Sequence, residues 1–111
     1  MIQKATDTRQ QQVNARREWA NECFERLGEA LNTLPDYVFV NYYRVDHDGQ
    51  PCFDVSPDSF ERLFAGRTVR LRRDYGWIEG EIDGVRFYAS GPRYRSQPQR
   101  DETITLPEVV S

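Results

Sequence analysis

The sequence has few of the residues that metal sites, disulfide frameworks and most catalytic centres require. Its 111 residues include two cysteines and one histidine, too few for a structural zinc site or a disulfide-stapled secreted domain. We expect Cys23 and Cys52 to be reduced and buried. No apolar run approaches the roughly 20 residues that a membrane helix needs, and the first residues lack the apolar stretch of a signal peptide. We therefore expect a cytoplasmic protein with no membrane partner.

A recognisable set of catalytic residues is also lacking. His47 lies in a turn between two aspartates, and no serine or cysteine motif nearby would make a nucleophile–base pair with it. The segment 46–49 departs from a calcium loop because its glycine comes too early. Gly66 begins no phosphate-binding glycine motif. We therefore expect no enzyme activity, no cofactor and no metal site.

Apolar residues recur at helical spacing near the N-terminus. From Val13 to Pro35 they lie three, four or seven positions apart, which predicts one long helix with a single broad apolar face. The helix starts near Val13, or as early as Thr6 or Thr8 if one of these threonines caps it. Residues 1–12 are polar and show no clear pattern, so we expect a partly flexible N-terminus.

Strand signals begin after this helix. Residues 37–45 carry aromatic and β-branched side chains on both alternating faces, which is typical of a central strand covered on both sides. A short return strand over 52–55 follows. Ser56 then caps a second, short helix that starts at Pro57 and is ended by Gly66.

Alternating apolar residues predict a three-stranded antiparallel meander over residues 68–89. Asp83-Gly84 is typical of a two-residue hairpin turn, and the register it sets places Ile82 opposite Val85. In the polar C-terminal segment 92–111, residues 103–106 are a candidate edge strand.

These elements together predict one α+β domain over residues 13–91. We expect the long N-terminal helix and the short helix to pack on a mainly antiparallel sheet of about five strands. No internal repeat and no second domain are evident.

Charge is unevenly distributed along the chain, whose net charge is −3. Residues 1–66 carry seven basic and eleven acidic side chains, a net charge of −4. Residues 67–100 carry eight arginines and four acidic residues, a net charge of +4. Arginine outnumbers lysine fourteen to one, and arginine suits bidentate and stacked contacts at interfaces better than lysine does. Two candidate surfaces follow from this pattern.

The first candidate surface is an acidic stripe on the long helix. Its four glutamates fall in one sector of the helix, opposite the apolar face. Such a stripe is either an ordinary solvated helix face or a docking surface for a basic partner, for example the nucleic-acid groove of a protein. The acidic stripe consists of Glu18, Glu22, Glu25 and Glu29.

The second candidate surface is the outer face of the meander together with the segment that follows it. Arginines and aromatic rings alternate there, as in surfaces that stack single-stranded bases and track phosphates. Glu79 and Glu81 lie on the same face, and cross-strand ion pairs with neighbouring arginines explain most of the pattern without a ligand. The surface consists of Arg70, Arg72, Trp77, Arg86, Tyr88, Arg93, Tyr94 and Arg95, and its excess of unpaired charge is expected at Arg93, Arg95 and Arg100.

The order of helix, two strands, helix and meander, closing on the segment Asp83–Ala89 (DGVRFYA), resembles small uncharacterised proteins of bacteriophages and other mobile elements. The resemblance covers roughly residues 37–91. Such proteins often resemble inhibitors of host defence, including anti-CRISPR proteins, which tend to be small, acidic, cofactor-free and non-enzymatic. The resemblance implies an inhibitor that acts in the host cytoplasm, and it assigns no site residue.

Three functions remain open from the sequence. The first is a non-enzymatic protein–protein interaction module, such as a phage-encoded inhibitor that covers a host nucleoprotein. The second is a small nucleic-acid-binding domain. The third is a self-associating structural protein, a homodimer whose apolar helix face pairs with its own copy, which requires Trp19, Cys23 and Leu27 to be exposed. The residues assigned to partner binding are Glu18, Glu22, Glu25, Glu29, Trp77, Tyr88, Arg93 and Arg95, and those assigned to nucleic-acid binding are Arg70, Arg72, Arg86, Tyr94 and Arg100.

Overall fold

The computed structural model describes residues 2–95 and 101–108, with side chains from Thr8 onward. It shows an α+β fold, as expected, with six strands where about five were predicted. The elements in chain order are α1 (Ile2–Thr33), β1 (Val40–Val45), β2 (Pro51–Val55), α2 (Pro57–Leu63), β3 (Thr68–Arg72), β4 (Trp77–Ile82), β5 (Val85–Ser90), the short 3-10 helix η1 (Pro92–Tyr94) and β6 (Asp101–Thr105).

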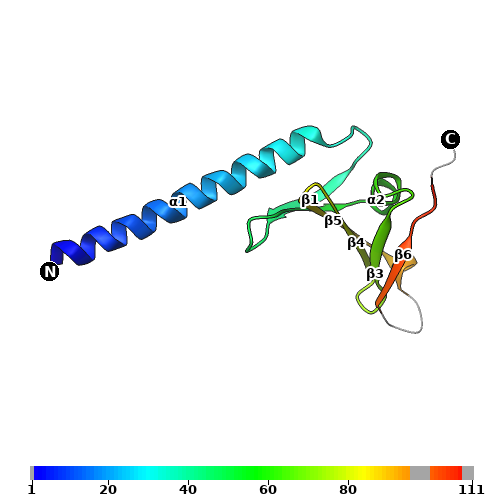
Figure 1. Ribbon diagram of the computed structural model, residues 1–111. Coiled ribbons are helices and arrows are strands. Elements are labelled where there is room, and N and C mark those ends of the chain that lie inside the picture. The colour runs from blue at the N-terminus through cyan, green and yellow to red at the C-terminus, as the bar shows by residue number, and fades with distance from the viewer. Residues whose placement is uncertain (1, 96–100, 109–111) are drawn as a thin grey trace.

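The six strands form one sheet in the order β1-β2-β5-β4-β3-β6 (Figure 1). Among the strands that the structure describes, only β2 and β5 are parallel, and every other neighbouring pair is antiparallel. The chain can make this parallel pair because α2, β3 and β4 lie between the two strands in sequence. The candidate strand near 103–106 is confirmed as β6, which pairs with β3 at one edge of the sheet.

The strand β1 corrects the expectation of a central strand covered on both sides. β1 lies at the opposite edge of the sheet from β6 and pairs only with β2 among the described strands. Tyr42 and Tyr43 are more than half exposed, and Phe39 just before the strand is 65% exposed. Composition indicates how well side chains suit a pleated, buried surface, but it does not place a second strand beside them.

The hairpin β4–β5 confirms the predicted register, with Ile82 opposite Val85. Asp83 and Gly84 both have positive φ, 51° and 78°, as a type I′ turn requires. Gly80 lies under the ring of Phe64: a Cβ at this position would come within 2.5 Å of the ring carbon Cε1. The bare backbone of β4 therefore lets α2 approach the sheet closely.

The core lies between the inner face of the sheet and the two helices. Phe53, Phe87 and Ile78 point from the strands toward Phe60 of α2 and Phe64, the residue that caps its C-terminal end. The rings of Phe60 and Phe64 stack with centroids 4.4 Å apart. Each of these buried side chains contributes about 1.5–3 kcal/mol relative to leaving it in water. α2 begins as predicted, because the Ser56 side chain accepts a hydrogen bond from the Ser59 backbone N–H.

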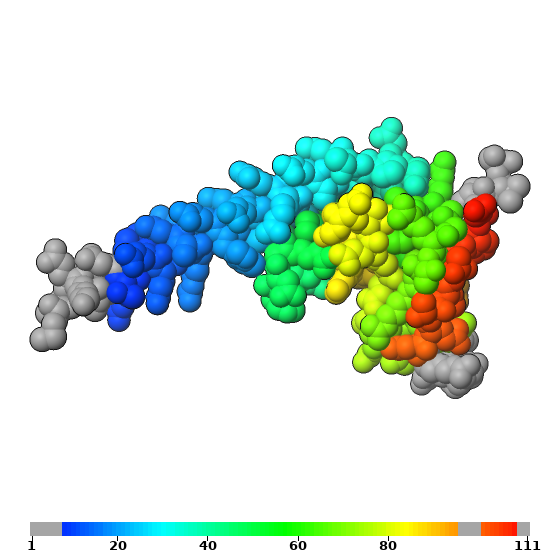
Figure 2. Space-filling model, viewed as in Figure 1, coloured from blue at the N-terminus to red at the C-terminus, as the bar shows by residue number. Residues whose placement is uncertain are grey.

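The helix α1 is much longer than the sheet that it covers. A helix of 32 residues extends about 48 Å, whereas strands of five or six residues span about 17–20 Å. Only its C-terminal part packs on the sheet, and the rest projects past the β1–β2 turn, which stretches the molecule to 65 × 33 × 20 Å (Figures 1 and 2). The helix begins at Ile2, earlier than the starts predicted near Val13, Thr8 or Thr6.

The expected broad apolar face of α1 is buried only in part. Cys23, Leu27 and Ala30 are buried against the sheet. Val13 and Phe24, which were expected on the same face, are exposed. No strand lies beneath Val13, and Phe24 lies on the flank of the helix. Within the described residues, no helix combines the length and the apolar character that crossing a bilayer requires.

Candidate interaction surfaces

The acidic stripe on α1 is exposed. Its four glutamates lie on the side of α1 opposite the buried Cys23 and Leu27, and Glu29 also lines the groove between α1 and the β4–β5 hairpin. Among the described residues, none of the four forms an ion pair. Arg26, the nearest basic residue in sequence, instead turns toward the sheet, with its Nη2 atom 3.7 Å from Cys23 Sγ.

Two large aromatic side chains lie beside the acidic stripe. Trp19 is about half exposed and Phe24 is 67% exposed. Trp19 also contacts the β1–β2 turn. Its indole carbon Cζ2 lies 3.5 Å from the position that a Cβ atom on Gly49 would occupy. The helix therefore presents charge and large apolar area side by side, the combination that interface hot spots use.

The outer face of the sheet carries most of the predicted arginine–aromatic surface. Tyr75 and Trp77 stack with ring centroids 4.7 Å apart, and the Arg72 guanidinium lies 4.9 Å from the Tyr75 ring centre. A shallow hollow of about 580 Å³ opens here, lined among others by Arg70 and Arg86. Arginine and stacked rings do lie together, as the sequence pattern indicated.

Carboxylates partner most of these arginines. The predicted pair of Arg70 with Glu79 is present, at 3.6 Å. Both Arg70 and Arg72 also bind Asp101 of β6, each through a 2.7 Å contact. Glu81 accepts a hydrogen bond from the Gln50 side chain rather than pairing with an arginine. Asp101 was missed by sequence reasoning because it lies about thirty residues further along the chain.

Tyr88 lies half buried on the same outer face, in β5. It hydrogen-bonds to Arg44 of β1, which raises the pKa of that arginine above its usual value. The tyrosine therefore links β5 to β1 across β2, and its ring is only partly available to a partner.

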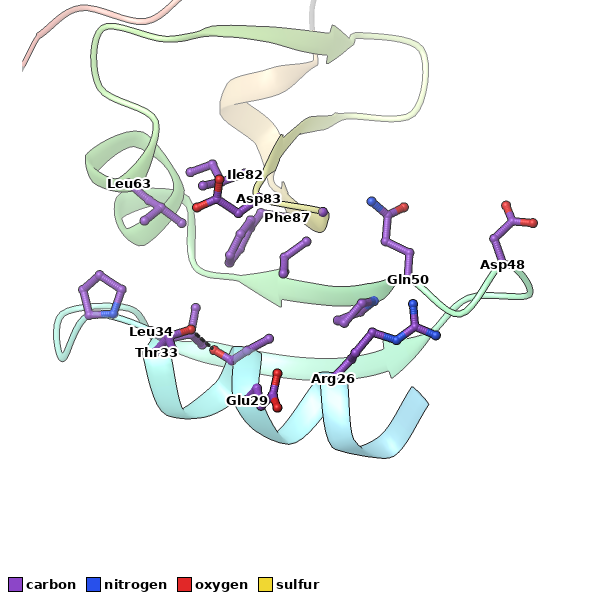
Figure 3. Close-up of a pocket in the computed structure, with 15 residues that line it drawn as sticks. Arg26, Glu29, Thr33, Leu34, Asp48, Gln50, Leu63, Ile82, Asp83 and Phe87 are labelled. Carbon is purple, nitrogen blue, oxygen red and sulfur yellow. Dashed lines mark hydrogen bonds between the residues drawn. The ribbon is translucent and has the colours of Figure 1, made fainter. Parts of the chain in front are cut away.

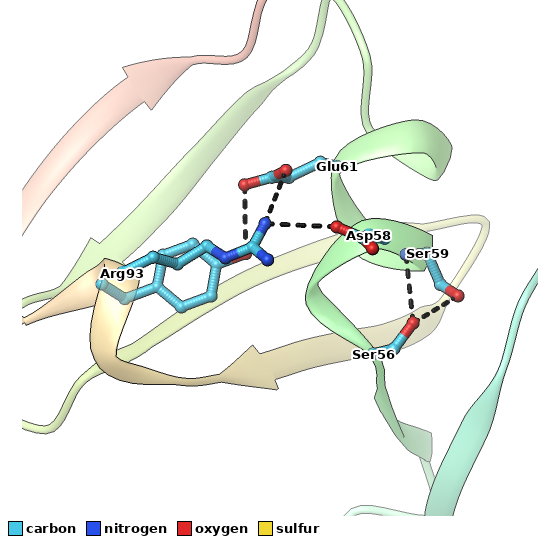
Figure 4. A network of polar contacts seen from close by, with 6 residues as sticks. Ser56, Asp58, Ser59, Glu61 and Arg93 are labelled. Carbon is cyan, nitrogen blue, oxygen red and sulfur yellow. Dashed lines mark hydrogen bonds and ion pairs between the residues drawn. The ribbon is translucent and has the colours of Figure 1, made fainter.

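The segment after β5 overturns the expectation of free arginine charge. Arg93 binds two carboxylates of α2: its Nη1 atom lies 3.1 Å from Glu61 and 3.3 Å from Asp58 (Figure 4). Tyr94 is only 5% exposed and donates a hydrogen bond to Glu61. Burial raises the pKa of Tyr94 well above its ordinary value. A ring held in this way cannot stack on a base.

Two further residues of this surface have different outcomes. Arg95 is exposed, and its side chain crosses Gly76, where a Cβ would come within 2.6 Å of Arg95 Cγ. Arg100 lies outside the described residues. The glycine thus makes room for the arginine stem, while the guanidinium remains at the surface.

A groove not foreseen from the sequence separates α1 from the β4–β5 hairpin (Figure 3). It has a volume of about 770 Å³. Leu34, just after α1, faces Ile82 and Phe87 across it, and Arg26 lies at one end. Its position depends on how α1 lies over the sheet, which no local sequence pattern reveals.

The two cysteines and the histidine behave as expected. Both cysteines are free and buried, and burial raises the pKa of the Cys52 thiol. The His47 side chain is 91% exposed in the turn after β1. In the described part of the chain, no three His, Cys, Asp or Glu residues are grouped as metal ligands.

The residues assigned to partner binding do not form one surface. α1 covers the inner face of the sheet and its acidic stripe points away from it, whereas Trp77 and Tyr88 lie on the outer face. Arg93 belongs to a third region, beside α2. Self-association through the apolar helix face requires Trp19, Cys23 and Leu27 to be exposed. Trp19 is exposed, but Cys23 and Leu27 are buried.

Comparison with known proteins adds no relative: no protein-family model matches the chain, and no curated protein or solved structure matches it significantly. The fold and surfaces define a small α+β domain with a projecting helix.

Proposed function

We propose that this chain is a non-enzymatic protein–protein interaction module whose acidic stripe binds a basic surface of a partner protein. The observation that carries the proposal is the position of Glu18, Glu22, Glu25 and Glu29 on the solvent side of α1, where none of them forms an ion pair with another described residue. Like charges at these spacings destabilise a helix slightly. A basic partner would remove that repulsion on binding.

The side chains on either side of the stripe support this proposal. Trp19 and Phe24 flank the stripe and supply apolar area, while the glutamates supply electrostatic steering. A groove that normally holds nucleic acid has the matching positive charge. We therefore propose a host nucleoprotein as the partner, which the protein would inhibit as phage-encoded anti-CRISPR proteins do.

A second candidate function, binding of single-stranded nucleic acid, is favoured by one observation. Tyr75 is half exposed and stacks on Trp77, with Arg72 against the same rings. Stacked rings beside an arginine are typical of base-binding platforms. The ion pairs of Arg70, Arg72 and Arg93 weigh against it, because a phosphate would have to displace Asp101, Glu61 or Asp58.

The test begins with a tagged pull-down from bacterial lysate, with and without nuclease. A protein retained after nuclease treatment is then purified, and its dissociation constant is measured by calorimetry. Glu22→Lys/Glu25→Lys should abolish binding while the circular dichroism spectrum is unchanged. Asp36→Lys/Asp48→Lys carries the same charge change at two exposed positions outside the stripe and should bind nearly as wild type.

Unchanged affinity of the Glu22→Lys/Glu25→Lys variant would show that the acidic stripe does not bind the partner. Recovery of nucleic acid that disappears with nuclease, and an affinity that falls steeply with salt, would favour the second function instead.

A further inference from the structure

The first part of α1 extends beyond the sheet and is not covered by it. Every side chain from Thr8 to Trp19 is exposed, whichever side of the helix it occupies. Trp19 marks the inner end of this part, because it contacts the β1–β2 turn at the end of the sheet (Figure 1). We call residues 8–17 the arm. A helix exposed on all sides gains no stability from packing in the free chain.

The arm is composed mainly of side chains that recognise nucleic acid. Seven of its ten residues are arginine, glutamine or asparagine, and none is acidic or aromatic. In the major groove of DNA, arginine makes paired hydrogen bonds to guanine, and glutamine or asparagine makes them to adenine. Arginine also binds phosphates through charge-assisted hydrogen bonds. The composition of the arm therefore matches both parts of a DNA duplex, the backbone and the base edges.

The three arginines of the arm are available to a ligand. None of Arg9, Arg16 and Arg17 forms an ion pair with another side chain in the described part of the chain, and all three are exposed. The arginines of the outer sheet face, by contrast, are mostly held by carboxylates. The arm consequently carries three positive charges that a polyanion can reach without displacing an internal partner.

Two of these arginines lie on the same side of the arm. Arg9 and Arg16 are seven residues apart, which places them about 20° from each other around the helix, with Gln12 beside them. Leu27, further along this side of α1, is buried against the sheet. The arginine side of the arm therefore faces the open corner between the projecting helix and the end of the sheet (Figures 1 and 2). The acidic stripe lies on the opposite side of α1, away from this corner.

We propose that the arm binds duplex DNA, with the side that carries Arg9, Gln12 and Arg16 in the major groove and Arg17 against the adjoining phosphates. Arg17 lies about 90° around the helix from the other two arginines, as a contact to the groove wall requires. An α-helix about 10–12 Å wide fits a major groove about 12 Å wide. The proposal does not rest on the proposed function, because the acidic stripe remains free on the other side of the helix.

The arm favours duplex DNA over other polyanions. Binding of a single strand relies on aromatic rings that stack on its bases, and the arm has none. An RNA duplex has a major groove too deep and narrow for side chains to read. An acidic protein would satisfy the arginines but would not need the row of glutamine amides that accompanies them.

Fluorescence anisotropy with a labelled DNA duplex of mixed sequence tests the proposal. Arg9→Gln/Arg16→Gln should weaken binding at low salt by at least about tenfold, because two direct contacts are lost. Arg17→Gln should reduce the slope of log affinity against log salt by about one. Arg67→Gln/Arg86→Gln removes two charges at exposed positions outside α1 and should bind nearly as wild type. Absence of binding by wild type, or equal losses in the two double variants, would overturn the proposal.

Comparison of nucleic acids of one sequence separates groove binding from base stacking. The DNA duplex should bind more tightly than either its single strand or the corresponding RNA duplex. Tighter binding of the single strand would point to the stacked rings of Tyr75 and Trp77 and would overturn the proposal.

Hydrogen exchange shows where the duplex lies. The backbone amides of the arm should exchange rapidly in the free protein, because no packing protects them, and slowly with the duplex bound. Protection confined to the sheet would contradict the proposal. Glu22→Lys/Glu25→Lys changes the opposite side of α1 and should not weaken duplex binding, so this proposal and the proposed function can fail separately. Circular dichroism confirms that each variant is folded.

Discussion

Arg72 Nε lies 2.7 Å from Asp101 Oδ1, across the antiparallel pair β3–β6. The other oxygen of the same carboxylate is 2.7 Å from Arg70 Nη2. One carboxylate thus holds two arginines of the outer face and ties the last strand to the sheet. Arg70 and Arg72, which the sequence pattern assigned to nucleic-acid binding, thus hold β6 against β3.

Replacing this carboxylate should loosen β6. In Asp101→Asn the amide keeps the shape but loses the charge, so both arginine contacts weaken. We expect the backbone amides of β6 to exchange faster than in wild type at pH 7, measured by hydrogen exchange. Asp83→Asn, which changes an exposed turn residue, should leave them unchanged. Equal protection of β6 in Asp101→Asn and wild type would show that the bridge does not hold the strand.

The same contact should make β6 sensitive to acid. The hydrogen bond from Arg70, together with the charges of both arginines, holds the pKa of Asp101 below its ordinary value. The stabilisation is fully present above the unfolded pKa, near about 4, and is lost as the pH falls through the lower folded pKa. Protection of β6 in wild type should decline in this range, with little change in Asp101→Asn.

Ser59 should be important for the connection between α1 and the sheet. Its buried hydroxyl oxygen lies 2.8 Å from the Phe39 backbone N–H and 2.7 Å from the Ser56 hydroxyl, both of which donate to it. Ser59→Ala leaves these donors unpaired, and we expect a loss of about 1–3 kcal/mol in the free energy of unfolding. Denaturant unfolding measures it, with Ser90→Ala at an exposed position as the control. A loss no larger than that of the control would contradict this role.

Gly80 should not tolerate a methyl group. A Cβ there would lie 2.5 Å from Phe64 Cε1, so Gly80→Ala must displace a ring in the core. We expect destabilisation by about 1–3 kcal/mol in thermal or denaturant unfolding. Gly28→Ala adds the same methyl where no atom lies within 4 Å. This change should be neutral or stabilising by up to about 1 kcal/mol. Equal effects of the two changes would disprove the steric argument.

Several elements could be predicted because their signals are local. The Asp83-Gly84 turn and the alternation on both sides of it set the β4–β5 register, which the structure reproduces pair by pair. Ser56 and Pro57 mark the start of α2 correctly. In each case a few adjacent residues carry the whole signal, since backbone preference and side-chain period act over short distances.

The candidate surfaces were predictable only in part. The acidic stripe is exposed as expected, because helical spacing alone assigns its residues to one side. The excess charge assigned to Arg93 was wrong, because its partners Asp58 and Glu61 lie more than thirty positions earlier in the chain. Tyr94 was assigned to a surface and is buried for the same reason.

The sequence by itself determined the α+β class, the main helix and strand segments, the hairpin register and the side of α1 that carries the glutamates. Periodicity, capping and turn chemistry act within a few residues, so these features need no distant contact. Only the tertiary structure decided that β1 is an edge strand, that α1 extends past the sheet and that Asp101 bridges two arginines. Each of these depends on which distant segments become neighbours, and that is settled when the whole core packs.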